Sequence, residues 1–411
     1  MKKTSLGSIF LTIFIDLIGV GMAIPVITPL LLNSNKLFAA SVTFQTRSII
    51  LGLLLASFPI LQFFGAPLLG ALSDRYGRKK VLIVSIFGTA CGYILFALGI
   101  ITNQLWLLFV SRSLDGFTGG NISTAMSVIS DVSEGKDRTK NFGLVGMAFG
   151  LGFILGPFLG GKLSDPTVLS WFNNATPFWA AALLCLLNIG LLIFRFKETL
   201  KTTIHTKITA LTGFKNIIHA WQMPNLRRVF LTIFFLTAGF TFFTQFFQVF
   251  LIERFSFSNS QIGNVFAYVG LWMAFTQGFL TRPAIKRFKV EDILSWAALG
   301  MVFVFPLLTL PKVAWLIFLI LPLTAIFQGH IQPTSTSIVS SLAGPEAQGE
   351  VMGINQSITS LAMIAPPIIS GMIAGVHYTY PLFAASFFTL VGWLFFQSHR
   401  HHQSREKFQV V

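Results

Sequence analysis

The sequence predicts an all-α polytopic membrane protein with twelve transmembrane helices in two pseudo-symmetric six-helix bundles. Hydrophobic residues make up 54% of the 411 residues and charged residues only 10%, whereas about a quarter of the residues of a soluble protein are charged. Twelve charge-poor stretches come close to or exceed the roughly 20 residues that a membrane-spanning helix needs. They cover residues 8–32, 48–73, 81–101, 104–128, 141–163, 174–194, 229–252, 261–281, 293–311, 314–340, 351–374 and 380–398.

Internal repetition supports the division into two halves. A shift of 210 residues carries glycines and a proline of the fifth stretch onto matching residues of the eleventh. A shift of 208 residues carries the charged turn after the second stretch onto a basic turn after the eighth. Such duplication is common in transporter folds, and it predicts bundles related by a pseudo-two-fold axis along the membrane normal. The matched pairs include Gly143 with Gly353, Pro157 with Pro367, Gly161 with Gly371 and Gly70 with Gly278.

The longest polar connection separates the two halves. Apolar residues recur within it at helical spacing, at Leu211, Phe214, Ile217, Ile218 and Trp221. We therefore expect an amphipathic helix on the inner membrane surface, although a flexible tether is an alternative. The expected domains are a first bundle at 1–195, a cytoplasmic linker at 196–226, a second bundle at 227–398 and a cytoplasmic tail at 399–411.

The net charge of +15 is explained by membrane topology. If the N-terminus is cytoplasmic, 23 Lys and Arg lie on the cytoplasmic side and five on the other side, as the positive-inside rule requires. We expect the protein to lie in a bacterial inner membrane with both termini in the cytoplasm. No nucleic-acid partner is expected. Cys91 and Cys185 both fall in apolar stretches, so neither a disulfide framework nor a metal site is expected, and no cofactor is predicted.

A charged block at residues 70–80 joins the second and third stretches. Gly70, Asp74, Gly77 and Arg78 have the spacing of the loop between helices 2 and 3 of major facilitator superfamily transporters, which the sequence resembles here. The resemblance implies the major facilitator fold. With Arg75, these residues are expected to form a conformational latch between the halves, in which Asp74 opposes a helix N-terminus. The alternative is a basic loop that only sets topology.

The fifth stretch resembles the antiporter glycine motif of the drug–proton antiporter branch of that superfamily. Its glycines allow a neighbouring helix to approach closely, and its proline kinks the helix. Generic small-residue packing is the alternative interpretation. The motif residues are Gly143, Gly152, Gly156, Pro157, Gly160 and Gly161.

Three ionisable residues within the stretches are candidates for proton coupling. Arg112 and Asp115 are three residues apart on the fourth stretch, in a segment similar to the family's Arg-x-x-x-Gly motif, and can pair on one helix face. Asp16 lies in a segment that resembles helix 1 of tetracycline-type exporters, and we expect it to carry protons. Alternatively, Asp115 only braces the bundle, and Asp16 is a fixed hydrogen-bond acceptor for the fourth or fifth stretch.

In the family, helices 1, 4, 7 and 10 line the substrate cavity, which makes polar residues of these helices candidates. His330 is a candidate because histidine is the side chain that most readily changes charge near neutral pH, but a lone histidine in a membrane span is more often a packing element. The candidate cavity residues are Asn121, Gln245, Gln248, Gln328, His330 and Gln332.

Two features depart from the tetracycline-type subgroup. The third-stretch position that carries an Asp in that subgroup is Gly92 here, and residues 293–311 contain no acid. These departures argue against tetracycline itself as the substrate.

The expected function is proton-coupled export of amphipathic small organic molecules of the drug or multidrug type. Transport is expected to proceed by alternating access, and the protein is expected to work as a monomer in the lipid bilayer. Two alternatives are a proton-coupled importer of a nutrient or siderophore-like metal chelate and a non-transporting membrane sensor. The glycine motif disfavours the importer, and the intact charged loop disfavours the sensor. An enzyme is not expected, because no nucleophile–base set, metal-ligand cluster or phosphate loop is present in the sequence.

Overall fold

The computed structural model describes residues 2–33, 36–132, 136–200, 212–342 and 348–409. The described residues form helices and connecting turns, with no strand among them. The predicted all-α class is therefore confirmed. The chain divides into two compact units, one of Met1–Thr212 with Ser256–Gly270 and the other of Gly213–Phe255 with Leu271–Val411.

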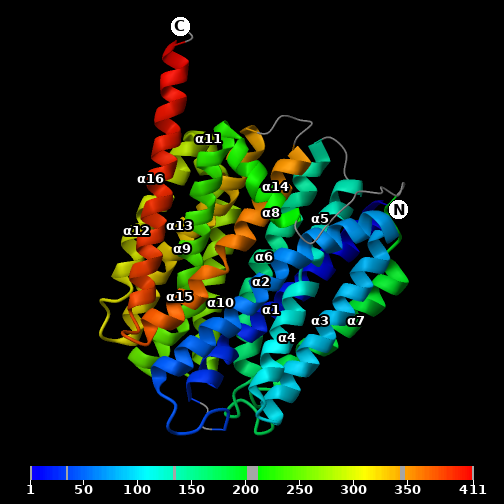
Figure 1. Cartoon of the computed structure of the whole chain (residues 1–411), viewed down its shortest axis with the longest axis vertical. Coiled ribbons are helices and arrows are strands. Elements are labelled where there is room, and N and C mark those ends of the chain that lie inside the picture. The colour runs from blue at the N-terminus through cyan, green and yellow to red at the C-terminus, as the bar shows by residue number, and fades with distance from the viewer. Residues whose placement is uncertain (1, 34–35, 133–135, 201–211, 343–347, 410–411) are drawn as a thin grey trace. The chain divides into compact units, whose positions relative to one another are not determined.

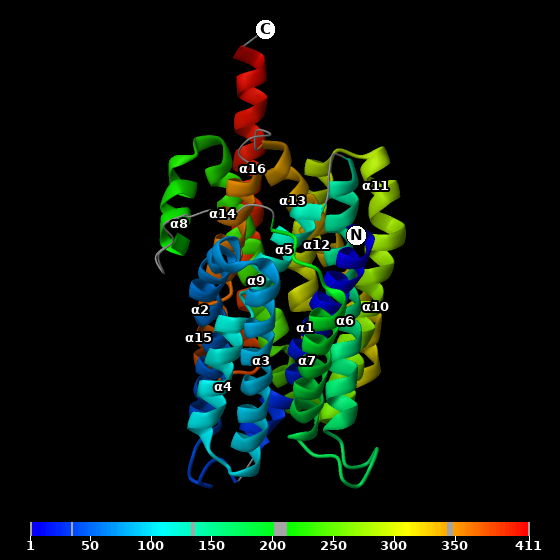
Figure 2. The same ribbon diagram turned by 90° about the vertical axis from the view of Figure 1, so that its right-hand side faces the viewer.

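Unit 1 is built around two sets of long helices. α1 packs along α6 and α7, and α4 packs against both α2 and α3 (Figures 1 and 2). α7 also packs along α3, so the helices form one bundle. The helices are α1 (Lys2–Asn33), α2 (Phe44–Tyr76), α3 (Arg78–Ile101), α4 (Leu105–Thr118), α5 (Asn121–Val132), α6 (Lys136–Leu163), α7 (Thr176–Arg195) and the first part of α10 (Asn259–Phe275).

Unit 2 is organised around a long central helix, α9, that packs along α16. A second group forms where α12 packs against α13 and α16. The elements are α8 (Thr212–Gln222), α9 (Pro224–Phe255), a π-helical turn (Thr276–Leu280), α11 (Thr281–Arg287), α12 (Val290–Leu307), a 3₁₀ turn (Ala314–Leu316), α13 (Ile317–Leu342), α14 (Gln348–Ala362), α15 (Ala365–Ala374) and α16 (Tyr380–Gln409).

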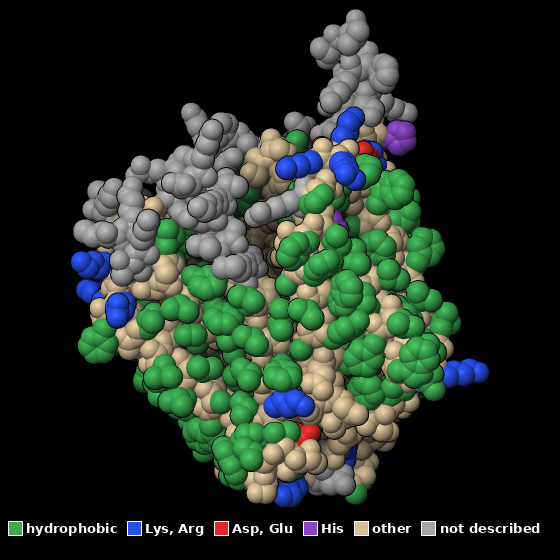
Figure 3. Space-filling view, turned by 180° about the vertical axis from the view of Figure 1, so that it is seen from behind, with side chains coloured by type: hydrophobic (Ala, Val, Ile, Leu, Met, Phe, Trp, Pro, Cys, Tyr) green, Lys and Arg blue, Asp and Glu red, His purple; other side chains and the backbone are tan. Residues whose placement is uncertain are grey.

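The helices account for the predicted spans. Among the described residues, nine helices are long and apolar enough to cross a membrane. The three other predicted spans fall on α6, on α4 with α5, and on α10 with the π-helical turn. In Figure 3, hydrophobic side chains cover most of the visible face, and Lys and Arg lie mainly toward its ends. Large apolar side chains such as Trp296 and Phe303 are exposed, as expected for helices that face lipid.

The fourth predicted span is interrupted between α4 and α5, where it crosses α2. A β-carbon added at Gly116 would lie 2.8 Å from Phe58 Cα, and one at Gly120 would lie 2.6 Å from the Gly65 carbonyl carbon. Only glycine allows two helix backbones to approach this closely. The crossing therefore fixes the register of α4 against α2.

A helix, α8 (Thr212–Gln222), lies in the segment expected to be the linker, and it groups with unit 2. Its inner face is made of small residues, because Gly213 and Ala220 are buried, and Asn216 Nδ2 donates a 3.1 Å hydrogen bond to Ser357 Oγ of α14. Ile218 and Trp221 are exposed on the other face. Leu211, the first residue of the predicted apolar pattern, lies outside the described residues.

Candidate functional site

A polar cluster lies inside unit 1, between α1, α3, α4 and the start of α5. On α1, Asp16 Oδ2 accepts a 2.8 Å hydrogen bond from Asn121 Nδ2, so one candidate cavity residue is engaged by a candidate proton carrier. Asp16 Oδ1 is buried and accepts no hydrogen bond from the described part of the chain. The carboxyl is thus held on one side and left with a free acceptor on the other.

Arg112 and Asp115 are both buried on α4, at 7% and 2% exposure. Within the described residues no hydrogen bond or ion pair joins them, and both Asp115 oxygens lack a hydrogen-bond donor. The Arg112 guanidinium instead lies 4.6 Å from the centre of the Phe58 ring of α2. The expected direct pair is not formed, because one side chain leans toward α2 and the other toward α3.

In the charged turn, Asp74 pairs with Arg78 of the same unit, whereas the expected partner was a helix N-terminus of the other half. α2 ends at Tyr76 and α3 begins at Arg78, so Gly77 alone makes the turn, with a φ of 101° that favours glycine. Arg78 is buried and pairs with Asp74. Its Nε also lies 3.1 Å from Asp131 Oδ2 of α5. Arg78 thus connects α2, α3 and α5 at one end of unit 1.

Glu198 is a functional candidate that the sequence reasoning missed. Its carboxylate accepts 3.0 Å hydrogen bonds from the backbone N–H groups of Arg78 and Lys79, the free donors of the first turn of α3. A β-carbon at Gly77 would lie 2.6 Å from Glu198 Oε2, so the glycine also makes room for the carboxylate. Asp131 was missed as well, and Thr199 Oγ1 donates to it at 3.2 Å. No local pattern pointed to either residue, because Asp131 and Glu198 lie 53 and 120 residues from Arg78 along the chain.

The glycine motif of α6 packs against two helices. On the α1 side, a β-carbon at Gly152 would lie 2.6 Å from Leu17 Cβ, and one at Gly156 would lie 2.7 Å from Gly21 Cα. Gly160 likewise contacts Met22. The motif therefore presses on α1 directly beside Asp16. Side-chain positions around Gly143 lie outside what the structure describes.

The other edge of the motif packs on α10. A β-carbon at Gly161 would lie 2.6 Å from the Asn259 carbonyl oxygen, and one at Gly263 would lie 2.5 Å from the Pro157 carbonyl oxygen. Lys162 Nζ donates a 2.8 Å hydrogen bond to Ser260 Oγ. These contacts group the first part of α10 with unit 1.

Comparison with known proteins identifies the family. A family model described as Major Facilitator Superfamily matches residues 9–365 and 229–409. The chain belongs to the Major Facilitator Superfamily. It is a multi-pass membrane transporter and not an enzyme.

Curated relatives within the superfamily include drug-resistance proteins. The chain is 32% identical over 362 residues to the tetracycline resistance protein, class C, of Escherichia coli, covering 87% of this chain and 86% of that protein. It is 26% identical over 406 residues to the quinolone resistance protein NorA of Staphylococcus aureus, covering 98% of each.

Solved structures agree with the fold. The human organic anion transporter MFSD10 (TETRAN) gives a TM-score of 0.75 at 23% identity, over 96% of this chain and 99% of that one. A D-xylose–proton symporter also gives 0.75, at 17% identity, over 95% and 97%. At these identities the likeness shows the major facilitator fold alone.

The candidate cavity residues of unit 2 have mixed surroundings. Gln248 of α9 is 2% exposed, and its Oε1 accepts no hydrogen bond from the described chain. His330 of α13 is buried, and its Nδ1 lies 2.7 Å from the Ile326 carbonyl oxygen, one helical turn back. That bond favours a packing role for His330. Gln245 and Gln328 are half-buried, whereas Gln332 is exposed.

The pseudo-symmetric partners of the glycine motif differ from each other. Pro367 is buried in α15, but a β-carbon at Gly353 would meet no atom within 4 Å. A glycine at 353 is therefore not required by close packing inside unit 2.

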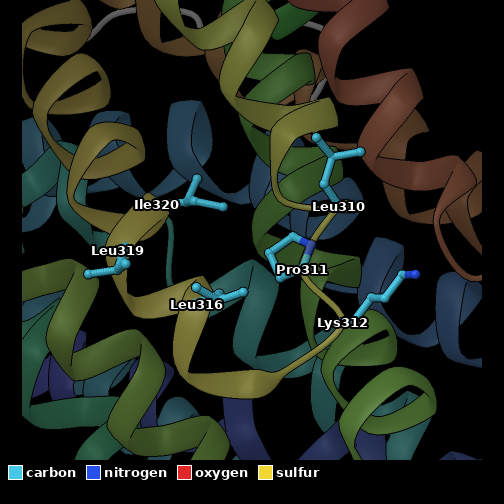
Figure 4. Close-up of a pocket in the computed structure, with 6 residues that line it drawn as sticks. All are labelled: Leu310, Pro311, Lys312, Leu316, Leu319 and Ile320. Atoms are coloured by element: carbon cyan, nitrogen blue, oxygen red, sulfur yellow. The ribbon is translucent and has the colours of Figure 1, made fainter.

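A groove of about 460 Å³ lies at the connection between α12 and α13 (Figure 4). It is lined by apolar side chains and one lysine, and it brings together no acid or polar cluster. The groove is therefore no candidate for the coupling site. Its lining residues are Leu310, Pro311, Lys312, Leu316, Leu319 and Ile320.

The two cysteines lie on α3 and α7. Cys185 is buried and Cys91 is half-buried, and both are free thiols. Within the described residues, no group of three or more His, Cys, Asp or Glu could hold a metal ion.

Proposed function

We propose that this protein exports amphipathic small organic molecules across the inner membrane and takes up protons in exchange, by alternating access. The observation that carries the proposal is the carboxyl of half-buried Asp16, whose Oδ1 atom is buried and which lies where the α6 glycine motif presses on α1. The relatives named for resistance to tetracycline and quinolones support a drug-like substrate.

Asp16 and Asp115 are the proposed proton-coupling acids. A charged group inside a membrane bundle is costly unless it faces a partner or a wet cavity, so such groups usually mark ion or substrate pathways. Asp16 has one amide partner, and Asp115 has no hydrogen-bond donor in the described chain. Each has a free acceptor site for a proton. Arg112, stacked on Phe58, supplies the positive charge nearby.

The charged turn is the proposed conformational latch. Arg78 is buried between Asp74 and Asp131, and breaking these contacts at the membrane surface would free the ends of α2 and α3 to move. Gly70 packs near Ser123 of α5, so this end of α2 is also held closely.

The remaining parts of the proposal concern topology and partners. The excess of Lys and Arg on one side supports cytoplasmic termini, with α8 on the inner surface of the bilayer. The partners are the transported small molecule, protons and lipid, and no nucleic acid. The protein works as a monomer, with bundles at 1–195 and 227–398, a linker at 196–226 and a tail at 399–411.

Everted membrane vesicles with an imposed pH gradient test the function. We expect accumulation of a quinolone or ethidium that collapses when the gradient is dissipated. Asp16→Asn keeps the shape and the acceptor oxygen for Asn121 but loses the titratable proton. It should therefore abolish gradient-driven accumulation while downhill movement persists.

Asp115→Asn is the matched variant, because it makes the same change at the second acid. If Asp16→Asn builds the wild-type gradient and Asp115→Asn does not, proton carriage belongs to Asp115 alone. If substrate moves with the protons rather than against them, the protein is a symporter and export is wrong.

A further inference from the structure

The carboxyl of Asp115 occupies the space that a side chain of residue 92 would need. A β-carbon added at Gly92 would lie 2.8 Å from Asp115 Cγ and 3.5 Å from Oδ2, and it would overlap Oδ1. Asp115 is only 2% exposed. The missing side chain on α3 is therefore filled by an acid reaching across from α4.

The two helix backbones cannot move apart easily to relieve such an overlap. Ser111 Oγ of α4 donates a 2.8 Å hydrogen bond to the Gly92 carbonyl oxygen, and Ser85 Oγ of α3 donates a 2.6 Å bond to the Thr118 carbonyl oxygen. On the other side, Gly116 already presses on the backbone of Phe58. α4 is thus fixed between α2 and α3.

Charged groups as well as packing contacts surround the space shared by Gly92 and Asp115. Arg112, one turn before Asp115 on α4, is buried as well and lies over the Phe58 ring. Neither Asp115 oxygen accepts a hydrogen bond from the described residues. A carboxyl that only braced the bundle would be expected to have such a donor.

We propose that Gly92 is a positioning residue for Asp115, and that α3 and α4 enclose room for one carboxyl side chain that either helix can carry. The inference rests on the proposed function in one respect only, the assignment of proton coupling to Asp115. The spatial part stands on the contacts. Two consequences follow, one for stability and one for coupling.

The stability consequence is tested on purified protein in detergent by thermal unfolding. Gly92→Ala should lower the Tm, because the new methyl group takes the place of the carboxylate, which must then rotate into the packed surroundings. The same change in an Asp115→Ala background should have little effect, since the overlapping atoms are gone. Gly88→Ala, which meets Thr118 one turn away, is the matched control and should cost the same in both backgrounds. A Gly92→Ala protein as stable as the wild type, or a loss independent of residue 115, overturns the proposal.

The coupling consequence is tested in everted vesicles with a quinolone and ethidium as probes. Asp115→Gly should lose accumulation driven by the pH gradient. The exchanged variant Gly92→Asp with Asp115→Gly should regain it, whereas Gly92→Asn with Asp115→Gly should not. Gly92→Asp alone should lose accumulation driven by the pH gradient, because two carboxyls would share the space of one.

The two tests separate failure of the inference from failure of the function. A folded exchanged variant that accumulates no more probe than Asp115→Gly overturns the exchange, as does full coupling by Asp115→Gly itself. If the wild type moves neither probe against the gradient, the proposed function fails for these probes, and the unfolding comparison still decides whether Gly92 positions Asp115.

Discussion

Removal of the Glu198 carboxylate should loosen the first turn of α3. The carboxylate accepts hydrogen bonds from the Arg78 and Lys79 backbone N–H groups and folds back to accept from Thr199 N and Leu200 N. It therefore acts as an N-terminal cap that comes from the segment after α7 rather than from α3 itself. Glu198→Ala removes both the acceptor and the negative charge at the helix N-terminus.

The size of the effect follows from the cap. Replacing a capping side chain by alanine typically lowers helix stability by about 1 kcal/mol. A negative charge near a helix N-terminus contributes roughly 0.3–1 kcal/mol, which overlaps with the capping energy. A cost of about 1 kcal/mol raises the population of the open first turn roughly five-fold. Glu198→Gln keeps the acceptor oxygens in part and should have a smaller effect.

Hydrogen–deuterium exchange measures this opening directly. Under conditions where opening and closing are fast compared with chemical exchange, peptides that contain Arg78 and Lys79 should exchange about five-fold faster in Glu198→Ala, while peptides of α4 remain unchanged. Lys197→Ala, at the neighbouring exposed position, is the control. Unchanged exchange at the start of α3 would refute the assignment of Glu198 as its cap.

Two further outcomes are expected. Gly156→Leu should strongly reduce the yield of folded protein, because even a β-carbon there would lie 2.7 Å from Gly21 Cα and overpacking costs about 1–3 kcal/mol or more; size-exclusion profiles of a fluorescent fusion report it, and a normal monodisperse peak would contradict the close packing of α6 on α1. Asp74→Asn should keep insertion but slow transport, since it removes one partner of buried Arg78; a wild-type rate at equal membrane abundance would leave the loop with a topological role only.

Much of the fold could be predicted from the sequence, because membrane-spanning helices are recognised by their length and their lack of charged residues. The turn at Gly77 was also predictable, because a glycine in a charged block between two membrane spans favours a tight turn of the backbone. The interruption at Gly119 and Gly120 was harder. It depends on the approach of Phe58 and Gly65 from another helix, and no local pattern in the fourth span reports that approach.

The site was predicted less completely than the fold. Spacing on one helix suggested a pair between Arg112 and Asp115, but spacing says nothing about neighbours. Phe58 offers a ring to the guanidinium, and Gly92 offers empty space to the carboxylate, so the two side chains diverge. The roles of Asp131 and Glu198 depend on contacts 53 and 120 residues away along the chain, which a single sequence does not reveal.

The glycine crossing of α2 and α4 can act as a pivot about which α2 tilts. About 19 residues of helix separate Phe58, at the crossing, from Gly77, which corresponds to roughly 28 Å. A tilt of about 5° around the crossing would therefore displace the Gly77 turn by roughly 2.5 Å while moving Asp115, near the pivot, far less. A small rearrangement at the pivot would thus be amplified at the membrane surface, where Arg78 and its acids either meet or miss one another.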